Sequence, residues 1–141
     1  MLSDTYSKTD CQAKLSIDGF GTIADATLTD AFNDAKLFDL IPIIGESLYD
    51  SLADIAKADY TTDQLYIYWS EVYFAMAKVA QGEANTKLGA KLGASESISV
   101  EGYSSSSSGV SGKSKIALGY AMKAYELLGL AGYDPFKIGR N

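Results

Sequence analysis

Residues 61–81 read TTDQLYIYWSEVYFAMAKVAQ and carry the clearest helix signal in the chain. The side-chain oxygens at 61–63 can cap a helix start, because they accept hydrogen bonds from backbone N–H groups that lack a partner there. Tyr66 and Tyr73 lie on a neighbouring stripe and widen the apolar face, so we expect the central helix of a bundle, continuing to about Leu88. The main stripe repeats at spacings of four, three, four and three residues: Leu65, Trp69, Val72, Met76 and Val79.

Helical spacing recurs on both sides of this segment and predicts an all-α fold, a small bundle of about four helices. Within 25–92, Thr27 or Thr29 can cap a first helix, and Asp39 can cap a second one. Pro42 then falls in the first turn of the second helix, where proline is tolerated. The stripes are Leu28, Phe32, Ala35 and Phe38, then Ile44, Leu48, Leu52 and Ile55, and finally, in a last helix over 115–131, Ile116, Tyr120, Ala124 and Leu127. The expected core packs Leu65, Trp69, Val72 and Met76 against Leu48, Leu52, Ile116 and Tyr120.

The composition predicts one soluble domain over 1–141, because 47% of the 141 residues are hydrophobic and 21% are charged. The chain has no histidine and one cysteine, which excludes an internal disulfide, the usual zinc clusters and histidine general bases. Residues 1–63 hold twelve acids and four lysines (net −8), whereas 64–141 hold six acids and eight bases (net +2). Such an acidic surface disfavours sequence-specific nucleic-acid binding. The most apolar run, 40–44, is too short for a membrane span.

Two segments lack a helical pattern. Residues 1–24 are expected to form a weakly ordered, extended arm, because apolar and polar residues alternate over 13–20, a pattern that also suits a short edge strand. Residues 93–114 contain ten serines and four glycines. The partial alternation of Ile98, Val100 and Tyr103 favours an extended polar limb or hairpin, and a disordered loop is the alternative.

Several residues could carry chemistry, but each has a simpler interpretation. The GFGTIA sequence at 19–24 matches G-x-G-x-x-A, yet it lacks the strands of a dinucleotide fold and suits a turn into a helix. The pairs Asp30/Asp34 and Asp50/Asp54 suit solvated helix faces better than a metal site. Cys11 is expected to be inert, and Trp69 with its neighbouring tyrosines is expected in the core. We therefore assign no catalytic, cofactor or metal residue.

The order of these elements resembles the head-to-tail connector (adaptor) proteins of tailed bacteriophages. The resemblance rests on DAKLFDLIPIIGESLYDSLADI (34–55), on the aromatic helix QLYIYWSEVYFAMAKVAQ (64–81), and above all on SESISVEGYSSSSS (95–108) before the last helix. It implies a structural virion protein, made in the host cytoplasm and located in the neck. Its copies would form a ring that contacts the portal and a tail or stopper protein, while DNA passes through the ring.

Arms, limbs and tails are the parts that ring subunits use to contact neighbours. We therefore expect the tail at 132–141 to dock on another protein, and the alternative is that it folds back on its own bundle. The predicted partner-binding residues are Tyr133, Pro135, Phe136 and Ile138 in the tail and Ile98, Val100 and Tyr103 in the limb. The alternative function is a small helical module that binds a protein or an apolar ligand.

Overall fold

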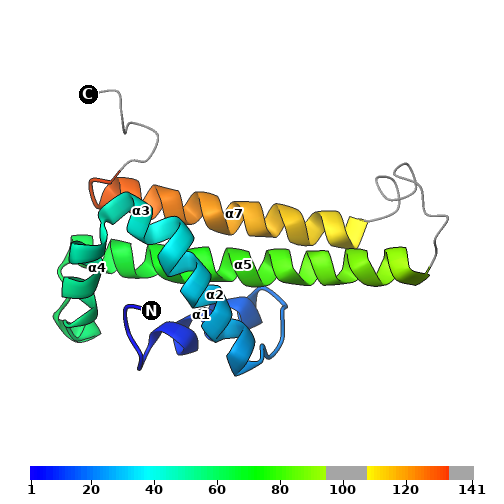
Figure 1. The fold of residues 1–141 in the computed structure, drawn as a ribbon, viewed down its shortest axis with the longest axis horizontal. Helices are drawn as coiled ribbons and strands as arrows, with labels where there is room; N and C mark the ends of the chain where they lie inside the picture. The colour runs from blue at the N-terminus through cyan, green and yellow to red at the C-terminus, as the bar shows by residue number, and fades with distance from the viewer. Residues whose placement is uncertain (95–107, 134–141) are drawn as a thin grey trace.

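Helix α5 runs the length of the molecule, and α1, α2 and α7 pack against it (Figure 1). This computed structural model describes the backbone of residues 1–94 and 108–133, and the side chains of 1–83 and 115–133. Every regular element in these ranges is helical, which confirms the predicted all-α fold. The elements are α1 (Ser7–Ile17), α2 (Asp25–Asp34), η1 (Ala35–Leu40), α3 (Ile41–Ile44), α4 (Glu46–Ala53), η2 (Lys57–Asp59), α5 (Thr62–Ala94) and α7 (Ser108–Leu130).

Helix α5 begins with a capping box. The backbone N–H of Gln64 donates to Thr61 Oγ1 at 3.2 Å, and the backbone N–H of Thr61 donates to Gln64 Oε1 at 2.9 Å. The helix is buried around most of its circumference, which confirms its predicted central position. Its buried residues are Ile67, Tyr68, Ser70, Glu71, Val72, Phe74, Ala75, Met76, Val79 and Ala80.

Helix α7 packs antiparallel to α5, and the two form a hairpin that extends beyond α1 and α2 (Figure 1). The predicted limits of the polar limb and the last helix are wrong at both ends. Residues 93–94 belong to α5, and 108–114 belong to α7, which begins seven residues before the predicted start. Residues 95–107 lie outside the described part of the chain.

The predicted helix from Asp39 to Ile55 is wrong, because the chain is helical from Asp25 to Ile44 and then breaks at Gly45. A six-residue π-helix, η1, precedes Pro42, whose ring would clash with the carbonyl of Phe38 in a regular α-helix. Asp39 therefore lies inside the helix, where it pairs with Lys78 of α5 at 3.1 Å. Gly45 separates α3 from α4 at φ +89°, a conformation that other residues rarely adopt.

The predicted extended arm is wrong over residues 7–17, which form α1. Its buried face consists of Ser7, Cys11 and Leu15, each four residues from the next. Because Ser7 is polar and only Cys11 and Leu15 on this face are usual core residues, the helical period is hard to see in the sequence. Gly19 and Gly21 follow at positive φ, which confirms that 19–24 is a glycine-rich turn leading into α2.

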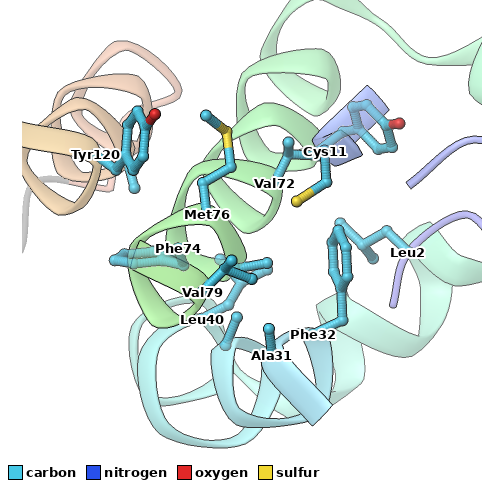
Figure 2. Packing of buried hydrophobic residues seen from close by; sticks show 14 of the residues in the cluster. Leu2, Cys11, Ala31, Phe32, Leu40, Val72, Phe74, Met76, Val79 and Tyr120 are labelled. Atoms are coloured by element: carbon cyan, nitrogen blue, oxygen red, sulfur yellow. The ribbon is translucent and has the colours of Figure 1, made fainter. Parts of the chain in front are cut away.

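The core lies on both sides of α5. Figure 2 shows Tyr120 of α7 on one side and Cys11 and Phe32 on the other, with Val72 and Met76 between them. The predicted core is confirmed for Val72, Met76, Leu52 and Tyr120, which are buried, while Leu65, Trp69 and Leu48 are partly buried against it. Ile116 was placed wrongly. It is 37% exposed, and the next residue, Ala117, is buried instead. Consecutive residues of a helix point about 100° apart, so these two side chains cannot both face α5.

We expect Trp69→Ala to cost about 2–3 kcal/mol in free energy of unfolding, less than a fully buried tryptophan. The indole packs edge-on against Tyr68, with ring centres 5.3 Å apart, and Lys14 and Lys57 lie over it, but part of it reaches solvent. Urea denaturation measures the change. Ile17→Ala, at an exposed position at the end of α1, is the control and should change stability by less than about 0.5 kcal/mol. Equal effects of the two variants would contradict the position of Trp69 in the packing.

Candidate interaction surfaces

A buried carboxylate on α5 fixes the start of the chain to the core. Glu71 is fully buried, and its Oε1 accepts a hydrogen bond from the backbone N–H of Leu2 at 2.7 Å. Its Oε2 accepts a hydrogen bond from the Tyr49 hydroxyl of α4. Burial raises the pKa of Glu71, and burial together with the nearby carboxylate raises the pKa of Tyr49. One side chain thus joins the N-terminal residues, α4 and α5.

A second polar cluster fixes α1 to α5. Lys57 Nζ lies 2.8 Å from Asp10 Oδ2, and the Tyr68 hydroxyl donates to the same carboxylate. The ammonium group also lies 5.2, 4.9 and 5.2 Å from the ring centres of Tyr6, Tyr68 and Trp69, within the range of cation–π attraction. Residues 1–17 are therefore held by a charge network, and this end of the chain is part of the folded body.

We expect the stability of the protein to depend on pH through Glu71. Burial raises the pKa of this carboxyl above its ordinary value of 4.5, so the native state favours the protonated form. The stability that the raised pKa of Glu71 contributes is fully present below the pKa of this carboxyl in the unfolded chain. It is lost as the pH rises through the pKa of the carboxyl in the native state. The free energy of unfolding of the wild type should therefore fall relative to that of Glu71→Gln as the pH rises above 4.5. Urea denaturation across this range measures it, and a constant difference would contradict the raised pKa.

The face of α7 that points away from α5 carries exposed apolar side chains. We call this the outer face of α7, and define it by Lys115, Leu118, Met122, Lys123 and Glu126. Leu118 and Met122 are 61% and 63% exposed, and they are neighbours on the helix because they are four residues apart. Their exposure follows from the packing of α7, whose extensive contacts are with α5.

An open groove of about 510 Å³ lies between α2 and α5. We call it the α2–α5 groove. Ile23, Ala31 and Val79 supply its apolar lining, and Gly82 leaves space at one end. Its polar lining includes Asp30 and Asp34 on α2 and Lys78 and Glu83 on α5. The groove is therefore apolar with mainly acidic edges.

The residues that were considered for chemistry are either buried in the core or exposed to solvent. Cys11 is fully buried, and burial raises the pKa of its thiol to about 12, so the thiol stays protonated at neutral pH. Asp30, Asp34, Asp50 and Asp54 are all exposed, which agrees with solvated helix faces. Among the described side chains, those of residues 1–83 and 115–133, no group is arranged to hold a metal ion.

Among the predicted partner-binding residues, only Tyr133 lies in the described part of the chain. Its side chain is partly buried against the core, and its backbone N–H donates to the carbonyl of Leu128 at 2.7 Å. The start of the predicted tail therefore packs on its own bundle. The other six predicted residues lie outside the described ranges: Pro135, Phe136, Ile138, Ile98, Val100 and Tyr103.

Sequence reasoning missed both polar clusters and the groove. A signal for Glu71 was present, since it is the only acid between Gln64 and Gln81 in an otherwise apolar helix. A charged residue inside such a stripe needs a buried partner. Nothing in the sequence indicated that the partner is the backbone of Leu2, which is 69 residues away.

Comparison with protein-family models, with curated proteins and with solved structures found no match to this chain. None of the helices in the described ranges has both the length and the apolar character needed to cross a membrane.

Proposed function

We propose that the protein is a structural subunit of a phage virion, a head-to-tail adaptor whose copies form a ring between the portal and the tail. The observation that carries the proposal is the outer face of α7. Leu118 and Met122 lie in water on a helix that the rest of the described chain covers on one side only. Adjacent exposed apolar side chains are typical of a surface that a neighbouring protein covers.

The arrangement of the helices supports the same proposal. A helical segment is followed by a long aromatic helix, then by residues 95–107, and then by the last helix. This is the order on which the resemblance to phage adaptors rests. The α5–α7 hairpin extends beyond the body of the molecule (Figure 1), so residues near its end can reach a neighbouring ring. The proposal assigns a structural role and no catalytic one.

Electron microscopy of the purified protein, alone and mixed with its portal, tests the proposal. We expect closed rings, at least on the portal, because each subunit interface is strengthened by the others in a closed ring. Single bundles at every concentration, with and without the portal, would contradict the adaptor function. That outcome would favour the alternative of a small module that binds one protein or an apolar ligand in the α2–α5 groove.

We expect the protein not to retain duplex DNA at physiological salt. The exposed acids Glu46 and Asp50 of α4, and Asp54 just after it, repel phosphates, so an acidic passage lets DNA move without sticking. Fluorescence anisotropy with a labelled duplex measures binding at about 0.15 M salt. Tight binding would contradict a passage lined by the acidic half of the chain.

A further inference from the structure

We propose that the outer face of α7 of one copy docks into the α2–α5 groove of the next copy. This inference rests on the proposed ring and names the two surfaces that build it. Leu118 and Met122 would enter the apolar part of the groove, formed by Ile23, Ala31 and Val79. Leu118 and Met122 are 61% and 63% exposed in the single chain, so the contact removes their apolar area from water, while Ala31 and Val79 already belong to the core and form the base of the groove.

Charge complementarity selects a second copy as the occupant. The outer face of α7 presents two lysines, Lys115 and Lys123, and a single acid, Glu126, which lies 3.6 Å from Lys123. The groove presents two exposed acids on α2, Asp30 and Asp34. Its lysine, Lys78, is already paired with Asp39 at 3.1 Å, so its charge is compensated within the chain. With these internal pairs set aside, Lys115 remains on the outer face of α7, and Asp30 and Asp34 remain in the groove, so the two surfaces carry opposite charge.

The positions of the two surfaces agree with a ring. Helices α2 and α7 both pack on α5 but make few contacts with each other, so the groove and the outer face of α7 lie on different sides of the molecule. A contact between two different surfaces is heterologous, and repeating it gives a closed ring or an open filament. A self-complementary surface would instead end at a dimer.

Gly82 allows a test that separates docking from folding. No atom lies within 4 Å of a Cβ built at Gly82, and leucine favours a helix more than glycine does. Gly82→Leu should therefore keep or raise the melting temperature, while its side chain fills the end of the groove and prevents ring formation. The control is Ala53→Leu, which adds bulk at an exposed position of α4 outside the groove. Normal rings from folded Gly82→Leu would overturn the proposal.

Cross-linking tests the contact directly. The double variant Gly82→Cys/Met122→Cys, oxidised at ring-forming concentration, should give a ladder of covalent oligomers on a non-reducing gel. Each single variant should give at most dimers, and the double variant Ala53→Cys/Met122→Cys should give no ladder. The native Cys11 does not interfere because it is fully buried. If micrographs show rings but no ladder forms, this interface is wrong and the adaptor function stands. If no rings form in any condition, the adaptor function itself fails.

Discussion

Glu71→Ala should destabilise the protein by about 3–5 kcal/mol, a large part of the stability of a typical domain. The substitution leaves the backbone N–H of Leu2 and the hydroxyl of Tyr49 buried without their acceptor. Each unsatisfied buried donor costs about 1–3 kcal/mol, and the missing side chain adds a cavity. Removing a buried carboxylate also removes its desolvation cost, but this gain does not restore the two lost hydrogen bonds.

Urea denaturation and hydrogen exchange measure the two consequences of this substitution. The free energy of unfolding should fall, and the Leu2 amide should exchange faster, because the N-terminal residues lose their anchor. Glu71→Gln keeps a carbonyl acceptor and should lie between the wild type and alanine. Glu126→Ala, at an exposed position of α7, is the matched control. If Glu71→Ala lowered the free energy of unfolding no more than Glu126→Ala does, the N-terminal residues would not be anchored through Glu71.

Removing residues 134–141 should abolish assembly on the portal and leave the stability of the single chain almost unchanged. The cut follows Tyr133 because that side chain packs on its own core. Phe136 and Ile138 are the proposed docking residues, and burying an apolar side chain of this size contributes about 1.5–3 kcal/mol before ordering costs. In a ring, many tails would bind the portal together. The loss of a modest contact in each subunit would therefore release the whole ring from the portal.

Point variants separate docking from a general effect of shortening the chain. Phe136→Ser/Ile138→Ser should reduce assembly as the deletion does, and Lys137→Ser, between the same two positions, is the matched control. Electron microscopy with the portal measures assembly, and thermal denaturation measures stability. A deletion that unfolds the single chain would favour a tail that folds back on its own bundle. A deletion that assembles normally would show that the tail has no docking role.

Polar contacts fix the N-terminal residues to the rest of the described chain. Residues 1–17 are bound to α5 and η2 through Glu71 and through the contacts of Lys57 with Asp10 and Tyr68. The Tyr120 hydroxyl also donates to Asp18 at 2.5 Å and ties the end of α1 to α7. Elements that are far apart in the sequence are thus joined by buried or half-buried polar contacts.

The sequence by itself determined the helices whose signals are local. The capping signal at 61–63 and the wide apolar face of 61–81 were enough to predict α5 and its central position, and Thr61 is the residue that caps the helix. The stripe around Tyr120 predicted α7 in the same way. These features repeat within a few residues, so the pattern and the structure depend on the same short-range geometry.

Only the tertiary structure decided features that depend on distant partners. Helix α1 is stable because Ser7 and Cys11 are buried against the rest of the chain, although neither residue marks a helix in the sequence. The buried carboxylate of Glu71 depends on Leu2, 69 residues away. The outer face of α7 is exposed because of how α7 lies on α5, which decides that Ala117 is buried and Leu118 is not. The reason is physical: periodicity describes one helix at a time, whereas burial and polar pairing are set by the element that packs against it.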